Sequence, residues 1–298
     1  MAFSGTRSHV PVTSSGTRGS ARDFADLSWA FWLTELTGVL AAVASATGLF
    51  APSIYRDSPD WAAQARGTDL VTFAAAVPLL LIAPVLAARG WRPARIVWLG
   101  TLGYTLYMYV ISAFDVAFNP LFLVYVALLS LSVFSIITLT TEFDAIEIRE
   151  RAGADLPVRT TAGYLLGLAA LFALLWMRDI LPALAHGTVP TSLDGTRLPT
   201  NPVHVLDLST LLPLAALSGI WLWQRRPWGY LLAGAVLTTL TIVGASVVSS
   251  IAFEHRSDAS VSLAPVPVLV LVTLIGLWLL AVYLRRLDQR PAKRGAAE

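Results

Sequence analysis

The sequence predicts an all-α protein, a polytopic integral membrane helix bundle of about eight transmembrane helices with both termini in the cytoplasm. Three observations predict this fold. Hydrophobic residues make up 56 % of the 298 residues and charged residues only 13 %, whereas soluble domains carry about 25 % charged residues. Charge-free apolar runs of roughly the 20 residues that cross a bilayer recur along the chain. Basic residues concentrate in alternate connecting loops, as the positive-inside rule requires.

Eight apolar runs are long enough to span a membrane, and they lie near 28–50, 70–88, 95–113, 120–141, 162–182, 202–224, 228–251 and 265–284. These runs define a bundle over 28–284, between a polar cytoplasmic tail at 1–27 and a basic cytoplasmic tail at 285–298. The first tail is rich in Ser, Thr, Gly and Arg, which is typical of disorder. No apolar run occurs early enough for a cleaved signal peptide, so the first span is expected to act as an uncleaved anchor.

Residues in the loops indicate where several of the helices begin. Asp69 follows Gly67-Thr68 and is expected to cap the second span. Asn119-Pro120 and Asn201-Pro202 are start signals for the fourth and sixth spans, because proline fits the first turn of a helix. The loop 142–161 is expected to form a short polar helix. The residues downstream of the two Asn-Pro pairs do not align, so no internal repeat is predicted.

Orientation follows from the basic residues. Sixteen of the 21 lysine and arginine residues lie in the tails and the even-numbered loops, and five lie on the other side: Arg56, Arg66, Arg178, Arg197 and Arg256. This bias places both termini in the cytoplasm. Arginine greatly outnumbers lysine and Ala, Gly and Pro are abundant, which favours a GC-rich bacterial genome and therefore the bacterial cytoplasmic (inner) membrane.

Composition excludes several classes of function. The chain has no cysteine, which excludes disulfides, thiol chemistry and covalent c-type haem. Its single lysine, Lys293, lies in the C-terminal tail, so neither a Schiff base inside the bundle nor a Walker-type phosphate loop is available. The basic residues are split among short loops, and nucleic acid is not a predicted partner. The histidines form no paired metal motif, so neither a metal nor another cofactor is predicted.

The sixth span holds the main candidate site. His204 and Asp207 are three residues apart and share a helix face. A carboxylate inside a membrane helix costs about 2.5–3.5 kcal/mol at the helix centre and less near an end, so Asp207 should face the bundle and be hydrogen-bonded. Pro213 removes a backbone hydrogen bond nearby, and an irregular backbone beside a carboxylate is typical of polar sites in membrane proteins. The alternative is that His204 and Asp207 only satisfy each other or a neighbouring arginine.

Two other spans can contribute to the same site. Arg178 and Asp179, at the outer end of the fifth span, should lie at the depth of His204 and Asp207 and could pair with them, although an arginine there can also extend to the interface. Tyr104 and Tyr107 share a face of the third span and form either core packing or the wall of a ligand pocket. Hydroxyl residues of the seventh span favour close helix packing. Glu35, in the first span, should lie in the opposite half of the membrane from Asp207.

These residues support three functional readings. The preferred one is binding of a small molecule or lipid, by a transporter or receptor, through an outer-half site of Arg178, Asp179, His204, Asp207, Tyr104 and Tyr107. The first alternative is an intramembrane metal-assisted hydrolase or a lipid-modifying enzyme, but the sequence carries no catalytic motif for it. The second is a structural or assembly protein in which the polar residues only join helices. The predicted partners are the lipid bilayer and this ligand.

Overall fold

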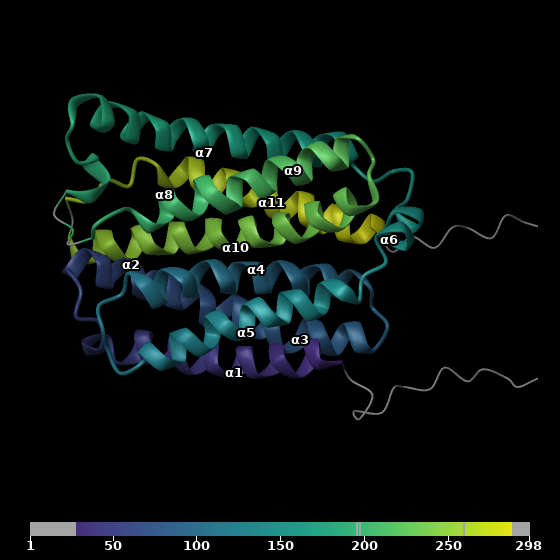
Figure 1. The fold of residues 1–298 in the computed structure, drawn as a ribbon, viewed down its shortest axis with the longest axis horizontal. Helices are drawn as coiled ribbons and strands as arrows, with labels where there is room; N and C mark the ends of the chain where they lie inside the picture. Colours follow the sequence, from purple (N-terminus) through teal and green to yellow (C-terminus); the bar gives the residue numbers. More distant parts are fainter. Residues whose placement is uncertain (1–27, 195, 197, 259, 288–298) are drawn as a thin grey trace, which may run out of the picture.

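The computed structural model describes residues 28–194, 196, 198–258 and 260–287 (Figure 1). All regular elements in these residues are helical, and eight helices among them are long and apolar enough to cross a membrane. This confirms the predicted all-α bundle with eight candidate spans. The predicted tail at 1–27 and residues 288–298 of the second tail lie outside the described residues.

The eight spans are built from ten α-helices and two π-helical segments. The bounds are α1 Trp29–Phe50; α2 Pro59–Val71, the π segment η3 Thr72–Ala76 and α3 Val77–Ala88; α4 Pro93–Phe114; α5 Phe122–Thr141; α7 Val158–His186; α8 Pro202–Leu206, the π segment η5 Asp207–Leu211 and α9 Leu212–Trp223; α10 Pro227–Ser257; and α11 Val266–Leu287. The short helix α6, Ala145–Arg151, connects α5 to α7, and 3₁₀ turns lie at Pro52–Ile54 and Thr191–Leu193.

Local capping explains most of these boundaries. Proline occupies the first turn of α2, α4, α8 and α10, where its missing N–H has no partner to lose. Asn201 caps α8 by accepting from the N–H groups of Val203 and His204. Asp144 caps α6 in the same way, which confirms a short helix in the loop 142–161.

The prediction that Asp69 caps the second span is wrong. The span begins at Pro59, eleven residues before the start predicted at residue 70, and Ser58 is its cap. Gln64 and Arg66 lower the hydropathy of residues 59–69, and for this reason the sequence analysis did not assign them to the span. Asp69 therefore lies inside the span. The seventh span is also longer than predicted and includes Glu254 and His255.

The bundle consists of two four-helix halves, α1–α5 and α7–α11, which lie side by side (Figure 1). The third span of each half, α4 and α10, lies in the centre, and the two helices pack against each other. In the most apolar stretch of α4 and of α10, 61 % and 56 % of the residues are buried. The corresponding fractions for the fourth spans, α5 and α11, are 28 % and 22 %. The junction between the halves is therefore the core of the molecule.

The second span of each half is broken in the same way. Each contains a five-residue π segment followed two residues later by a proline, Pro78 or Pro213. Proline cannot donate to the carbonyl four residues earlier, and the wider turn lets the N–H groups of Val77 and Leu212 bond the carbonyls of Thr72 and Asp207 instead. This confirms the irregular backbone predicted near Asp207.

The offset that superposes Pro78 on Pro213 also pairs Thr72 with Asp207. It pairs Gly100 of α4 with Ala235 of α10, and these two residues meet at the junction of the halves. The two halves thus share a repeat of helix order and helix breaks. The sequence analysis did not predict this repeat, because the two halves share the positions of their helix breaks but not a similar amino-acid sequence.

The junction depends on a glycine. A Cβ at Gly100 would overlap the carbonyl oxygen of Ala235 and the side chain of Thr238. The close approach lets the Thr239 hydroxyl donate to the Gly100 carbonyl at 2.8 Å. Small residues with hydroxyl hydrogen bonds are the usual means of close helix packing in membranes.

Replacing Gly100 should therefore separate the halves. We expect Gly100→Ala to lower the free energy of unfolding by about 1–3 kcal/mol, because extra atoms in a packed junction force backbone shifts. Equilibrium unfolding in mixed micelles would measure this change. Gly163→Ala is the matched control, since a Cβ there meets nothing within 4 Å and alanine favours a helix by up to about 1 kcal/mol. Equal stability of wild type and Gly100→Ala would contradict the close junction.

Candidate functional site

A cavity of about 410 Å³ lies between the two halves, toward the end of the bundle opposite α6. Its wall is formed by α2 and α4 of the first half and by α7, α8–α9, α10 and α11 of the second. The wall is mostly apolar, with aromatic side chains at several points: Tyr55, Trp61, Tyr107, Tyr164, Phe172 and Trp176. Cavities of this size and character are typical of small-molecule sites.

Three carboxyl groups line the cavity, those of Asp69, Asp207 and Glu254. No arginine, lysine or histidine is among the described residues that line it. The acidic side chains are spread around the wall, and the described residues contain no group of three or more His, Asp or Glu side chains placed to hold a metal ion. The cavity is thus an acidic and aromatic chamber.

Both carboxylate oxygens of Asp207 accept hydrogen bonds from neighbouring helices. Asp207 is 6 % exposed and begins the π segment η5. The Tyr107 hydroxyl donates to its Oδ1 at 2.9 Å, and the Trp176 indole N–H donates to its Oδ2 at 2.8 Å. The predicted bundle-facing, hydrogen-bonded position is confirmed. The donors are a phenol and an indole, and not Arg178, so neither of these hydrogen bonds comes from a basic side chain.

His204 lies beside Asp207 and outside the cavity wall. Its ring is buried and packs on Trp176, with ring centroids 4.5 Å apart. Trp176 thus contacts the His204 ring, lines the cavity and bonds Asp207. His204 supports the wall, and its predicted role in ligand binding stays a prediction.

Arg178 and Asp179 lie away from the cavity wall. Arg178 is exposed, and none of the ion pairs among the described residues includes it. Asp179 accepts from the N–H of Thr191 at 3.1 Å and from its hydroxyl at 2.7 Å. These bonds anchor the connection between α7 and α8. The structure does not bring this pair together with Asp207.

Tyr104 lies one turn of α4 before Tyr107, is not among the residues that line the cavity, and is fully buried. Its hydroxyl shares hydrogen bonds with Thr72 at 2.8 Å and with Ser246 of α10 at 2.9 Å. Ser246 lines the cavity, whereas Tyr104 does not. Two tyrosines one turn apart on α4 therefore contact the first residue of each π segment, Tyr104 at Thr72 and Tyr107 at Asp207.

Asp69 and Glu254 are the lining acids that the sequence analysis missed. Asp69 accepts from the Tyr55 hydroxyl at 2.5 Å, and the neighbouring Thr68 shares a hydrogen bond with Ser250 of α10. The Ser58-Pro59-Asp60 start signal could have extended the second span and so placed Asp69 inside it. Nothing local marks Glu254 as a lining residue.

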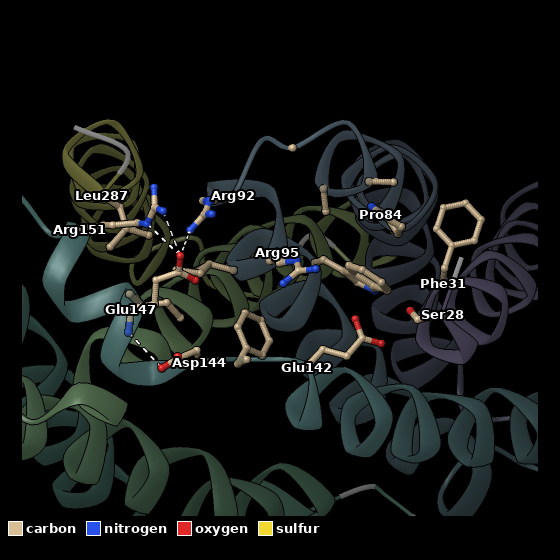
Figure 2. Close-up of a pocket in the computed structure, with 17 residues that line it drawn as sticks. Ser28, Phe31, Pro84, Arg92, Arg95, Glu142, Asp144, Glu147, Arg151 and Leu287 are labelled. Atoms are coloured by element: carbon tan, nitrogen blue, oxygen red, sulfur yellow. Dashed lines mark hydrogen bonds and ion pairs between the residues drawn. The ribbon is translucent and has the colours of Figure 1, made fainter. Parts of the chain in front are cut away.

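A second pocket of about 390 Å³ lies at the α6 end (Figure 2). Glu147 of α6 accepts from Arg92 at 2.6 Å and pairs with Arg151 at 3.0 Å. The side chain of Arg95 extends into the same pocket. The hydrogen bond from Arg92 lowers the pKa of Glu147 below its usual 4.5. These ion pairs attach α6 to the start of α4. Glu35 lines neither pocket, and its Oε1 is buried without a partner among the described residues.

No protein-family model, no curated protein and no solved structure matches this chain. The functional inference therefore rests on the geometry of the cavity.

The bond between Tyr107 and Asp207 should contribute to stability. We expect Tyr107→Phe to lower the free energy of unfolding by about 1–3 kcal/mol, because it removes a donor from a buried carboxyl group. Tyr109→Phe is the matched control on the same helix, since no hydrogen bond of its hydroxyl is found among the described residues. Unfolding in mixed micelles would measure both variants, and an equal effect of the two would contradict a specific role for the Tyr107 hydroxyl.

The ion pairs of Glu147 predict a pH dependence. A lowered pKa means that the charged form stabilises the fold at neutral pH, and that this contribution is lost as pH falls below about 4.5. Glu147→Gln should cost at most about 1 kcal/mol at pH 7, because the group is partly exposed and screened. The difference from wild type should shrink toward zero in acid and in high salt. Thermal unfolding against pH would measure it. The neighbouring Glu150→Gln, which lacks a resolved ion pair among the described residues, should show no such difference at any pH.

Proposed function

We propose that this chain is a multi-pass protein of the bacterial cytoplasmic membrane that binds a small molecule or lipid in the cavity between its two halves, as a transporter or a receptor. In this proposal the α6 end and both termini face the cytoplasm, and the cavity lies in the outer half of the membrane. The excess of arginine in the loops at the α6 end supports this orientation.

The cavity itself is the observation that carries the proposal. The cavity measures about 410 Å³, which is within the size range of small-molecule sites. It combines an apolar and aromatic wall with a few fixed polar groups, which is the usual composition of a ligand site. It also lies beside a π segment, and such irregular turns are frequent at functional sites.

The cavity also weighs against the alternatives. A purely structural role explains why Asp207 bonds Tyr107 and Trp176, but it gives no reason for a chamber of this size beside them. An enzyme that uses His204 as a ligand or base needs its imidazole to reach the substrate, and His204 is not among the described residues that line the cavity.

Filling the cavity should remove the ligand. We expect native mass spectrometry of the protein, released from membranes in mild detergent, to show a retained small molecule or lipid. Ser112→Trp places a large side chain from α4 into the chamber and should abolish that retention. Leu174→Trp is the control, because Leu174 is 70 % exposed on α7. Equal retention by Ser112→Trp and wild type would place the ligand elsewhere, and no retained molecule in wild type would count against the proposal.

A transporter and a receptor differ in uptake. If the protein is a transporter, sealed vesicles that contain it should accumulate the retained molecule, and Asp207→Asn should abolish accumulation without loss of folded protein. Binding without accumulation would assign a receptor. Circular dichroism of the same samples would confirm that Asp207→Asn stays folded.

A further inference from the structure

We infer that the ligand of this cavity is an organic cation, a primary to tertiary amine attached to an apolar body. This inference rests on the proposed function and adds the chemical class of the ligand. It follows from the charges of the wall, from the use of its hydrogen-bond donors and from its aromatic faces.

The charge balance of the wall favours a cation. Three carboxyl groups line the chamber, and no basic residue is among its described lining residues. Arg66 of α2 is not part of the wall: its guanidinium packs over the ring of Phe253 at 5.6 Å, although its charge also attracts that of Asp69. Charge interactions are strong in an apolar surrounding, so an anion would be repelled and a cation would supply the missing positive charge.

The donors of the wall are already used by the protein. The Tyr107 hydroxyl and the Trp176 N–H donate to Asp207, the Tyr55 hydroxyl to Asp69, and the Tyr164 hydroxyl to the carbonyl of Val272. The hydroxyls lining the other walls behave in the same way, donating to helix carbonyls: Ser112 to Met108, Ser250 to Gln64 and Thr273 to Leu269. Each carboxyl oxygen retains a free lone pair. A wall with spare acceptors and few spare donors matches a ligand that donates, as an ammonium group does.

One indole N–H is an exception and refines the ligand. The Nε1 of Trp61 is buried without a partner among the described residues, and Trp61 lines the cavity. This group can donate to one acceptor atom of the ligand. Trp61 and Trp176 both line the cavity, and tryptophan is the side chain that makes the best cation–π contacts.

The spread of the carboxyl groups argues for an organic ion and not a metal ion. Asp69 and Glu254 come from α2 and α10, whereas Asp207 comes from the π segment of the other broken span. The three do not gather into a metal-sized cluster, and most of the space between them is lined by apolar side chains. An amine with a hydrophobic body fills such a chamber, whereas a hydrated metal ion would leave the apolar wall uncovered.

A charge series on one skeleton tests the inference. The probes are 4-phenylbutylamine, 4-phenylbutan-1-ol and 4-phenylbutyrate, which carry a positive, zero and negative charge at pH 7. Isothermal titration calorimetry would measure their binding to the full chain in lipid nanodiscs, with empty nanodiscs subtracted. We expect the amine to bind at least ten-fold more tightly than the alcohol or the acid. Asp207→Asn and Asp69→Asn should each weaken the amine about ten-fold, which is about 1.4 kcal/mol.

Controls separate this inference from the proposed function. Asp194→Asn, an exposed loop change outside the wall, should leave amine affinity unchanged. If Asp207→Asn does not fold, Glu254→Gln provides a second test of the wall charge. Binding of the alcohol or acid as tight as that of the amine, lost in Ser112→Trp, would overturn the cation and keep the cavity as a site. No binding by any probe, together with a native mass spectrum free of retained molecules, would overturn both.

Discussion

Two prolines placed inside membrane-length helices constrain the whole bundle. In an apolar surrounding each backbone carbonyl needs a donor from the protein, and Pro78 and Pro213 each remove one. The π segments η3 and η5 widen one turn just before each proline, where the N–H groups of Val77 and Leu212 donate to the carbonyls of Thr72 and Asp207. Each widened turn then begins at a polar residue, Thr72 or Asp207, and each of these is bonded by a tyrosine of α4. Helix α4 thus holds both broken spans through its two tyrosines.

The two halves repeat this plan, but they do not meet symmetrically. On one side α2 packs closely along α10, where Gly67 lies against the backbone of Ser250. On the other side α8 touches α4 over a short stretch, and the bond between Tyr107 and Asp207 crosses the gap. The cavity occupies the side where the second contact is short. A ligand held there contacts both halves, which is the arrangement that a rocking carrier or a signalling receptor requires.

Some hydroxyl residues of α10 both pack against neighbouring helices and line the cavity. The Thr239 hydroxyl bonds the Gly100 carbonyl across the junction, and Ser246 and Ser250 bond α4 and α2. These contacts support the packing role predicted for the seventh span. Ser246 and Ser250 also line the cavity. Because the hydroxyl hydrogens of these residues bond within the protein, the cavity wall is rich in acceptors, and the proposed preference for cations rests on this property.

The sequence by itself determined the number of candidate spans, the cap at Asn201, the short helix in the loop 142–161 and the burial of Asp207, since hydropathy and capping are local properties. It did not determine the partners of Asp207: Trp176 bonds it, whereas Arg178, two residues away, points outward. It also did not place Asp69 or Glu254 in the wall. Hydropathy gives the depth of a residue and the helical period gives its face, but neither fixes how each helix is rotated toward its neighbours. The tertiary structure decided that rotation through side-chain packing at Gly100 and Gly67 and through the two tyrosines of α4, and so it decided which carboxyl groups share one chamber.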